Sequence, residues 1–248
     1  MSKWVLNPAF AQDKAGQLFA DLHSVFALQG EQITSDDISE VHRLYIEGRC
    51  YYIKRYIQAG KNLRRFIGRP RIRAEWENLL KFKHWGIPTV PVVAYGMERN
   101  GLGFGRGALI TLGIESTDDL AQLAKHNDPR LRDRDWLHSI LGQIATATRI
   151  MHNHGFAHND LKWRNILVDR TPTPQVYFID CPAGSKWPGP LLKYRIVKDL
   201  ACLDKVAKYH LRRTDRLRFY LFYAQSERLT QTDKKRIRTV LAFFEGRE

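Results

Sequence analysis

A run of polar residues followed by a short apolar strand is the feature that most constrains this chain of 248 residues. Residues 158–165 read His-Asn-Asp-Leu-Lys-Trp-Arg-Asn, and the apolar segment Val176–Ile179 leads into Asp180, fifteen positions after Asn165. Asp160 is of the type that accepts a proton from a hydroxyl group, and Asn165 and Asp180 supply the hard oxygen ligands that Mg²⁺ prefers. The spacing predicts a loop beside a strand and a site for phosphoryl transfer.

The loop resembles the catalytic loop of the protein-kinase-like fold, whose signature is His-x-Asp-x-x-x-x-Asn. His158, Asp160 and Asn165 match that signature, and Asp180 follows an apolar strand as the magnesium-binding Asp of kinases does. The Phe-Gly pair that usually comes after this Asp is replaced by Cys181-Pro182. This departure leaves the predicted metal ligand in place and argues against an activation segment that flips.

Each residue of the loop region has an expected role. We expect Asp160 to be the catalytic base and Lys162 to stabilise charge on the migrating phosphoryl group. Asn165 and Asp180 are the predicted magnesium ligands. We interpret His158 as a brace of the loop and not as an acid or base.

A kinase also needs a strand lysine that neutralises the nucleotide phosphates and a helix glutamate that holds this lysine. Lys54 lies in a predicted strand, and both Glu75 and Glu77 lie in the predicted helix that follows. We prefer Glu75 because it stands eleven residues before Gly86, a spacing similar to that in small atypical kinases. Lys54 and Glu75 thus predict binding of ATP, with Mg²⁺ as the accompanying ion.

The first 112 residues are predicted to form a small β-rich N-lobe. Alternating side chains predict a hairpin over residues 41–57, and a helical period predicts a helix over residues 72–85. Further strands are expected at residues 90–95 and 107–112, around a hairpin turn that holds Gly101, Gly103, Gly105 and Gly107.

Residues 113–248 are predicted to form a reduced, mainly helical C-lobe that begins with a helix cap at Ser116–Asp119. Helices are expected at residues 136–154, 199–209 and 214–224, with a hairpin between 166–168 and 176–179. The predicted fold class is α+β, a bilobal protein-kinase-like fold that forms one domain overall. Asp199 is predicted to brace the catalytic loop, and a surface or capping role is the alternative.

The turn that should cover the nucleotide phosphates is unusual. It should precede Lys54, between Ile33 and Val41, where the segment Thr34–Ser39 contains no glycine. The glycines after residue 100 follow the lysine strand and do not open a helix, so they do not form a phosphate loop.

The net charge of +14 favours partners that carry phosphate, without indicating which ones. No apolar run approaches the roughly 20 residues of a membrane-spanning helix, and no secretory signal opens the chain, so we expect a cytoplasmic protein. The three cysteines are interpreted as structural thiols. Two basic clusters could contact an anionic membrane surface or the substrate, or be solvated faces: Lys61, Arg64, Arg65, Arg69, Arg71 and Arg73, and Arg212, Arg213, Arg216 and Arg218.

Six segments between residues 41 and 224 resemble the bacterial lipopolysaccharide kinase family, the InaA and WaaP group. They are Tyr52–Tyr56, Glu75 through Thr89, His158–Leu161, Phe178–Asp180, Lys198–Ala201 and Arg216–Tyr220. The resemblance implies phosphorylation, dependent on ATP and Mg²⁺, of a heptose or Kdo hydroxyl in the lipopolysaccharide core at the cytoplasmic face of the inner membrane. The interval from Asp180 to the helix expected near residue 198 is short, lacks Ala-Pro-Glu, and gives a peptide substrate little platform.

Other functions stay open at this point. An atypical protein kinase or a small-molecule kinase would have the same fold, and a nucleotide-binding pseudokinase would keep part of the site. A basic nucleic-acid-binding protein is disfavoured because no recognised motif is present. A metal cluster of His152, His154 and His158 is disfavoured because no cysteine or carboxylate pattern completes it. The sequence does not indicate the oligomeric state or which sugar is the acceptor.

Overall fold

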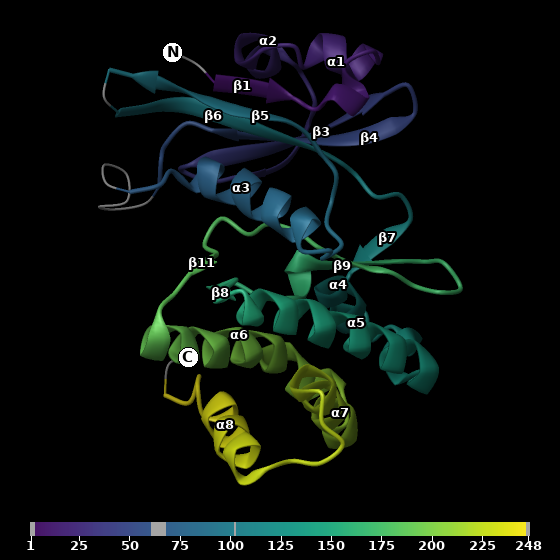
Figure 1. Ribbon diagram of the computed structural model, residues 1–248. Coiled ribbons are helices and arrows are strands. Elements are labelled where there is room, and N and C mark those ends of the chain that lie inside the picture. The colour runs from purple at the N-terminus through teal and green to yellow at the C-terminus, as the bar shows by residue number, and fades with distance from the viewer. Residues whose placement is uncertain (1–2, 61–67, 102, 247–248) are drawn as a thin grey trace. The chain divides into compact units, whose positions relative to one another are not determined.

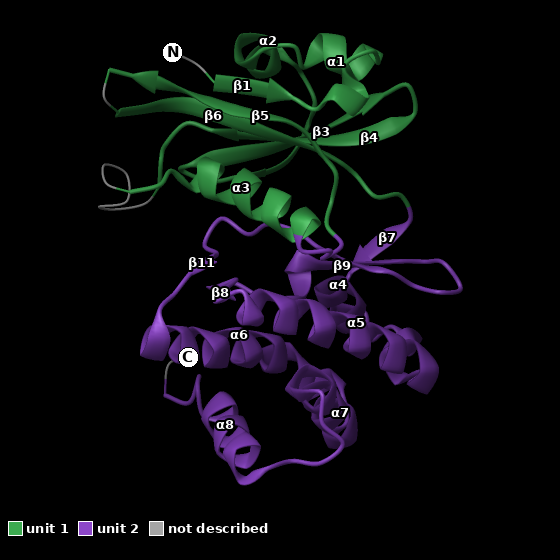
Figure 2. Ribbon diagram, viewed as in Figure 1, with its two compact units in different colours: residues 1–84, 89–115 green, residues 85–88, 116–248 purple. Residues whose placement is uncertain are grey.

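The computed structural model describes residues 3–60, 68–101 and 103–246. The chain divides into two compact units, coloured separately in Figure 2. Unit 1 comprises residues 1–84 and 89–115, and unit 2 comprises residues 85–88 and 116–248. The lobe boundary predicted after residue 112 therefore lies close to this division, and each unit is described by itself below.

Unit 1 is built on a six-stranded antiparallel sheet with strand order β1-β5-β6-β4-β3-β2. The predicted hairpin before residue 57 is present, because Ile46 pairs with Arg49 around a two-residue turn in which Glu47 and Gly48 both have positive φ. Such a turn matches the twist of the strands it joins. The strands are β1 (Lys3–Leu6), β2 (Glu31–Ser35), β3 (Ser39–Ile46), β4 (Arg49–Tyr56), β5 (Val92–Asn100) and β6 (Gly103–Leu112).

The second predicted hairpin is also present, but its strands are longer than expected. Asn100 pairs with Gly103, so the glycines at 103, 105 and 107 lie within β6, and the prediction that they form the turn is wrong. A side chain at Gly107 would bring its Cβ within 2.9 Å of the carbonyl oxygen of Gly96 on β5. At that position glycine permits a close backbone approach.

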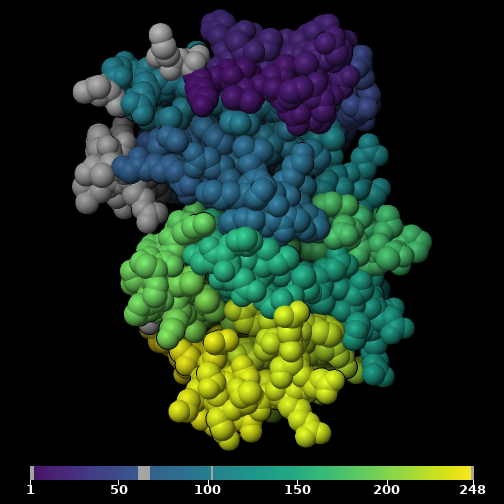
Figure 3. Space-filling model, viewed as in Figure 1, coloured from purple at the N-terminus to yellow at the C-terminus, as the bar shows by residue number. Residues whose placement is uncertain are grey.

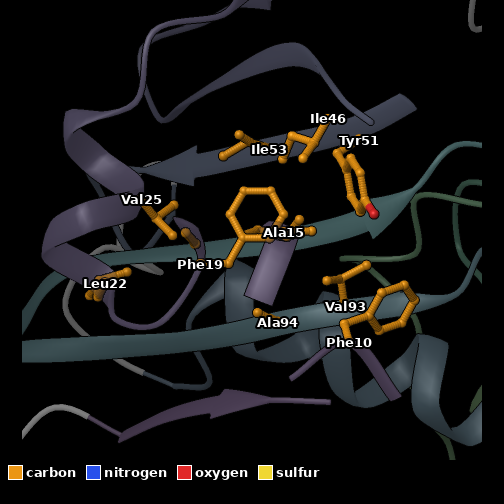
Figure 4. Packing of buried hydrophobic residues seen from close by; sticks show 12 residues of the cluster. Phe10, Ala15, Phe19, Leu22, Val25, Ile46, Tyr51, Ile53, Val93 and Ala94 are labelled. Carbon is orange, nitrogen blue, oxygen red and sulfur yellow. The ribbon is translucent and has the colours of Figure 1, made fainter. Parts of the chain in front are cut away.

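One face of the sheet is covered by short N-terminal helices that no sequence pattern predicted. They are η1 (Pro8–Phe10), α1 (Lys14–Leu18) and α2 (Leu22–Ala27). Figure 4 shows Phe19 and Val25 turned toward Ile53 and Tyr51 on β4, and the rings of Phe19 and Tyr51 meet edge to face at 5.4 Å. The buried guanidinium of Arg55 donates to the carbonyls of Val25 and Leu28 and so ties β4 to the end of α2.

The other face carries α3 (Arg71–His84), which packs on β5 and β6. Its boundaries agree with the predicted helix 72–85. Because side chains alternate along a strand, Lys54 and Tyr56 on β4 point to the opposite face from Ile53. They therefore point toward α3 and away from the N-terminal helices.

Unit 2 is mainly helical, as predicted (Figure 1). Its helices are α4 (Leu120–Lys125), η3 (Pro129–Arg132), α5 (Arg134–Asn153), η4 (Trp163–Asn165), α6 (Gly189–His210), α7 (Arg213–Ala224) and α8 (Gln231–Leu241). Short strands β7 (Thr117–Asp119), β9 (Ile166–Asp169) and β10 (Val176–Phe178) form one sheet, and β8 (Phe156–Ala157) pairs with β11 (Ser185–Lys186). The predicted α+β class is confirmed.

The start of α6 corrects a prediction. The helix begins at Gly189 and not near residue 199, because Pro188 is its N-cap and Pro190 lies in its first turn, where proline is tolerated. The segment between Asp180 and this helix is therefore shorter than predicted. Helix α8 was not predicted. Within the described ranges, every helix is too short or too polar to cross a membrane.

Asp118 forms ion pairs within unit 2 whose contribution to stability depends on pH. Its carboxylate accepts from Arg170 at 2.9 and 2.6 Å and from Arg130 at 2.8 Å, which lowers the pKa of Asp118 to about 2. A pKa below that of the unfolded chain stabilises the fold above about pH 4, and this contribution is lost as the pH falls toward about 2. Arg170 is exposed, so solvent screening limits the contribution to about 1 kcal/mol.

We therefore predict that Asp118→Asn lowers the free energy of unfolding by about 1 kcal/mol at pH 7 and that this difference disappears by about pH 2. Urea unfolding at several pH values measures it. Asp37→Asn, at an exposed position, is the matched control. A difference that stays constant from pH 7 to pH 2 would contradict the assignment.

Candidate active site

In unit 1, Lys54 and Glu75 form a largely buried ion pair. Lys54 Nζ lies 3.0 Å from Glu75 Oε1, with the side chains 19% and 4% exposed. Tyr56, two residues further along β4 on the same face, donates its hydroxyl to Glu75 Oε2 at 2.6 Å. The Lys54 ammonium also lies 5.5 Å from the centre of the Tyr56 ring. Both oxygens of Glu75 are therefore engaged, and the ammonium is held at a defined point of the strand.

Glu77, the alternative partner of Lys54, makes different contacts. Its carboxylate forms salt bridges with Arg69 at 2.8 Å and with Arg73 at 2.7 Å on the exposed side of α3. These ion pairs neutralise part of the first basic cluster. Its members Lys61, Arg64 and Arg65 lie outside the described residues.

In unit 2, the predicted catalytic residues lie on a loop between β8 and β9. The Asp160 side chain is 30% exposed, and its Oδ1 lies 2.6 Å from Lys162 Nζ. Arg164 approaches Oδ2 of the same carboxylate at 3.7 Å. The turn is closed by the backbone N–H of Lys162, which donates to the Asp160 carbonyl at 2.9 Å. The structure thus presents Asp160 to solvent with two cations beside it.

The two predicted metal ligands are neighbours. The side-chain nitrogen of Asn165 donates to the Asp160 carbonyl at 2.9 Å, which leaves the amide oxygen as the atom available to a cation. The N–H of Ile179 donates to the Asn165 carbonyl at 3.0 Å, so the end of β10 and Asp180 lie beside Asn165. Asp180 has φ +55°, a left-handed conformation that Asp tolerates better than most residues.

These oxygen donors fit Mg²⁺. That ion is usually held by one or two protein ligands together with substrate phosphates and waters, and not by a dedicated protein cage. The described residues contain no group of three or more His, Cys, Asp or Glu side chains that would form such a cage. A pair made of one amide and one carboxylate is therefore the kind of donor set that Mg²⁺ shares with a nucleotide.

Asp199, on α6, anchors the loop that begins at His158. Its fully buried carboxylate accepts the backbone N–H of His158 at 2.7 Å and that of Asn159 at 2.8 Å. The predicted brace is confirmed. His152 Nε2 lies 3.4 Å from the same carboxylate, and His152 Nδ1 lies 2.8 Å from the Tyr223 hydroxyl. Burial lowers the pKa of His158 below its usual range, which keeps this ring neutral.

The segment after Asp180 is pinned to the loop. Cys181 is fully buried, and the side-chain nitrogen of Asn159 donates to the Ala183 carbonyl at 2.9 Å. β11 pairs with β8, and the N–H of Trp187 donates to the Gly155 carbonyl at 2.9 Å. A side chain at Gly184 would collide with the Phe156 ring. Residues 181–188 therefore form a short, closed connection to α6.

The predicted phosphate turn closes on itself. Oδ1 of Asp36 accepts the N–H of Ile38 at 2.9 Å and that of Ser39 at 2.8 Å. These are the amides that a glycine-rich turn would direct toward phosphate. In this chain a carboxylate of the turn itself occupies them.

The second basic cluster is only partly available. Arg216 binds Asp204 through two contacts of 2.6 and 2.7 Å, and Arg218 lies 3.2 Å from Asp215. Arg212 and Arg213 are exposed at the start of α7. The cluster thus offers two exposed cations.

Sequence reasoning missed three residues that support the site. Tyr56 had a usable signal, since strand alternation places it on the same face as Lys54. His152 and Tyr223 lie 71 residues apart and carry no local signal that would link them. His154, a member of the disfavoured metal cluster, stacks on Trp85 with the ring centres 4.4 Å apart.

A family model described as the lipopolysaccharide kinase (Kdo/WaaP) family matches residues 16–237. Among solved structures, WaaP in complex with acyl carrier protein superposes with a TM-score of 0.76 at 24% identity, covering 99% of this chain and 97% of that one. This likeness confirms the predicted protein-kinase-like fold.

Curated relatives match shorter regions. The B1 kinase of Vaccinia virus (strain Copenhagen) is 26% identical over 121 residues, which is 48% of this chain and 38% of the relative. The probable serine/threonine-protein kinase FPV226 of Fowlpox virus (strain NVSL) is 26% identical over 154 residues, covering 61% of this chain and 44% of the relative. The chain thus spans less than half the length of the curated relatives it matches.

We predict that Asp199→Asn lowers the free energy of unfolding by about 1–3 kcal/mol, because an amide group cannot accept both loop N–H groups and leaves a buried donor unsatisfied. Urea unfolding measures the change. Amide hydrogen exchange at His158 and Asn159 should accelerate, whereas Asp13→Asn, in an exposed ion pair with Arg49, should change neither quantity. Unchanged exchange at the two loop amides would contradict the anchoring role.

Proposed function

Because the chain belongs to the lipopolysaccharide kinase (Kdo/WaaP) family, a family of phosphotransferases, we propose that it transfers a phosphoryl group from ATP to a heptose or Kdo hydroxyl of the lipopolysaccharide inner core. The observation that carries this proposal is the solvent-accessible Asp160 on a loop whose backbone is anchored by Asp199. The neighbouring Asn165 and Asp180 supply oxygen donors of the type that Mg²⁺ binds.

Asp160 would orient the acceptor hydroxyl and take its proton late in the transfer, because a loose, metaphosphate-like transition state needs little early base strength. Lys162 lies 2.6 Å from Asp160 in the free protein. Its ammonium would leave Asp160 and pair with the migrating phosphoryl group, where positive charge lowers the barrier. The exposure of both side chains is compatible with this exchange of partners.

Two sets of residues have proposed roles toward ATP, one for its phosphates and one for its Mg²⁺ ion. Lys54, fixed by Glu75 and Tyr56, offers its ammonium to the phosphates, and Asn165 and Asp180 would hold Mg²⁺. When bound, Mg²⁺ supplies charge neutralisation on the phosphate oxygens. The self-closed turn at Asp36 contributes less to phosphate binding than a glycine-rich turn does, which places more of that task on Lys54.

The closed segment 181–188 favours a sugar acceptor over a protein one. A protein kinase positions its peptide substrate on a longer activation segment that ends in Ala-Pro-Glu, and this chain has neither the length nor that sequence. Arg212 and Arg213 are exposed cations suited to a phosphorylated, anionic glycan. We place the reaction at the cytoplasmic face of the inner membrane, where this acceptor is assembled.

We predict that purified protein incubated with γ-labelled ATP, Mg²⁺ and dephosphorylated core lipopolysaccharide transfers label to the glycan. Asp160→Ala should reduce turnover about 10²–10⁴-fold and leave the affinity for ATP within about three-fold of wild type, because the carboxylate acts on the acceptor hydroxyl. Glycan labelling and equilibrium nucleotide binding measure the two effects.

Glu227→Ala, at an exposed position between α7 and α8, is the control and should retain full turnover. Label on polypeptide or on a soluble metabolite would replace the sugar acceptor with another one. ATP binding without transfer to any core acceptor would identify a pseudokinase, and undiminished turnover of Asp160→Ala would remove this residue from its proposed role.

A protein partner is a second element of the proposal. Unit 2 contains a partly open cavity of about 510 Å³ between α4, α5, α6, α7 and α8. Its lining is predominantly apolar and includes Leu131, Ile140, Leu203 and Ala207. The volume lies within the range of about 300–1,000 Å³ typical of small-molecule sites. Since the solved WaaP structure is a complex with acyl carrier protein, we propose that this cavity accepts the acyl chain of such a carrier.

Filling the cavity tests the carrier proposal. Ala207→Phe should weaken binding of acyl-loaded carrier protein at least about ten-fold, because the ring occupies the space that the chain would enter. Binding of the unloaded carrier should not change. Calorimetric titration measures both affinities, with a circular dichroism melt of the variant as a check of its fold. Equal affinity for loaded and unloaded carrier would contradict a role for the cavity.

A further inference from the structure

One surface of unit 2 combines exposed apolar side chains with basic ones. Leu191 and Tyr194, at the start of α6, are 54% and 46% exposed, and Leu241, at the end of α8, is 50% exposed. Lys193 and Arg238 line an open groove between them. In Figure 3 the green surface of the start of α6 adjoins the yellow surface of the C-terminal segment. We name these five residues, with Arg195, Phe243 and Phe244, the α6/α8 patch.

Contacts between aromatic rings, and between rings and cations, hold the side chains of the patch in place. The rings of Tyr194 and Phe243 lie 5.6 Å apart, and those of Phe243 and Phe244 lie 5.0 Å apart. The Arg195 guanidinium lies 4.4 Å from the centre of the Trp187 ring, and the Lys205 ammonium lies 5.0 Å from that of Phe244. Aromatic rings interleaved with cations, next to exposed leucines, are the composition of protein surfaces that enter the headgroup region of a bilayer.

The charge of the patch selects an anionic partner. Residues 185–198 contain four basic residues and no acidic one, and residues 231–246 contain four basic residues and two acidic ones. One of these acids, Asp233, is engaged by Thr230 and Tyr220, and the other, Glu245, lines the groove together with Lys193 and Arg238, so the groove keeps an excess of positive charge. A second copy of the chain would present the same excess of positive charge, so like-charge repulsion disfavours a symmetric dimer through this surface.

The shape of the patch favours a bilayer over a protein. Binding hot spots between proteins are deep, desolvated pockets that receive an anchor side chain. Here Leu191 and Leu241 are single exposed side chains at the ends of two helices, and the groove beside the aromatic rings is open and carries cations. A fluid layer with anionic headgroups can accept such separate tips and neutralise the cations between them.

We propose that the α6/α8 patch docks the protein on a membrane that carries anionic phospholipids. Leu191 and Leu241 insert at the level of the headgroups, Tyr194 lies at the boundary, and Lys193 and Arg238 contact lipid phosphates. The inference rests on the proposed function only for the expectation that the acceptor is attached to a membrane, and the patch includes none of the predicted catalytic residues.

Flotation of the protein with vesicles tests the proposal. Vesicles of phosphatidylethanolamine and phosphatidylglycerol should bind the wild-type protein, and vesicles of phosphatidylcholine should bind it at least about ten-fold more weakly. Lys193→Glu with Arg238→Glu, and separately Leu191→Ser with Tyr194→Ser, should each reduce binding to the anionic vesicles about ten-fold. Raising the salt concentration should weaken the wild-type interaction.

Two control pairs make the same chemical changes elsewhere on the surface. Lys14→Glu with Lys125→Glu alters net charge equally, and Tyr45→Ser with Leu80→Ser removes exposed apolar groups of unit 1. Both should retain vesicle binding. If the control pairs lose binding as much as the patch pairs do, the attraction is a general effect of net charge and the proposal fails. Wild-type binding by both patch variants would equally overturn it.

Kinase activity separates this inference from the proposed function. On delipidated core oligosaccharide the patch variants should turn over at the wild-type rate, whereas on acceptor embedded in anionic vesicles they should be about ten-fold slower. Equal rates of variants and wild type on the embedded acceptor would overturn the docking surface and leave the kinase assignment standing. A dimer in sedimentation velocity that the patch variants abolish would assign the surface to a second copy instead.

Discussion

The arrangement of unit 2 depends on the buried carboxylate of Asp199. A carboxylate without solvent is costly unless hydrogen bonds compensate it, and here the backbone N–H groups of His158 and Asn159 do so. Asn159 has φ 64°, a left-handed conformation that Asn adopts more readily than most residues, and the two bonds fix the backbone that leads into it. Because Asp199 belongs to the long helix α6, the loop, the start of η4 and the end of β10 take their positions from the helical core.

In unit 1 a buried carboxylate also holds a functional group in place, but there the group is the ammonium of Lys54. Glu75 is buried, one of its oxygens holds the ammonium of Lys54, and the other accepts the hydroxyl of Tyr56. A glutamate with both oxygens occupied restricts the lysine side chain to few conformations, which lowers the entropy cost of binding a phosphate there. In each unit a buried acid on a helix thus fixes a group of opposite polarity on a neighbouring loop or strand.

The sequence predicts those parts of the fold whose signal is local. The loop from His158 to Asn165 is contiguous, and the hairpin before residue 57 has both alternation and a turn signal, so both could be identified. Helices α1 and α2 are too short to show a helical period, and their burial becomes evident only when the sheet is assembled. The predicted helix 199–209 leaves out the first turns of α6, which follow Pro188 at the N-cap and include Pro190 in the first turn. Tyr223 reaches His152 only through the packing of α7 on α5, which no single segment encodes.

Two segments that move in regulated kinases are closed in this chain by its own side chains. Asp36 occupies the amides of the phosphate turn, and the pairing of β11 with β8 and the side chain of Asn159 hold the segment after Asp180. Neither closure requires a nucleotide or a phosphorylated residue, so the loop geometry is formed in advance of binding. Preorganisation of this kind lowers the reorganisation needed at the moment of reaction, at the expense of a switch. In a kinase without these two switches, access to the acceptor is the step left open to control, and the proposed α6/α8 docking surface would govern that step.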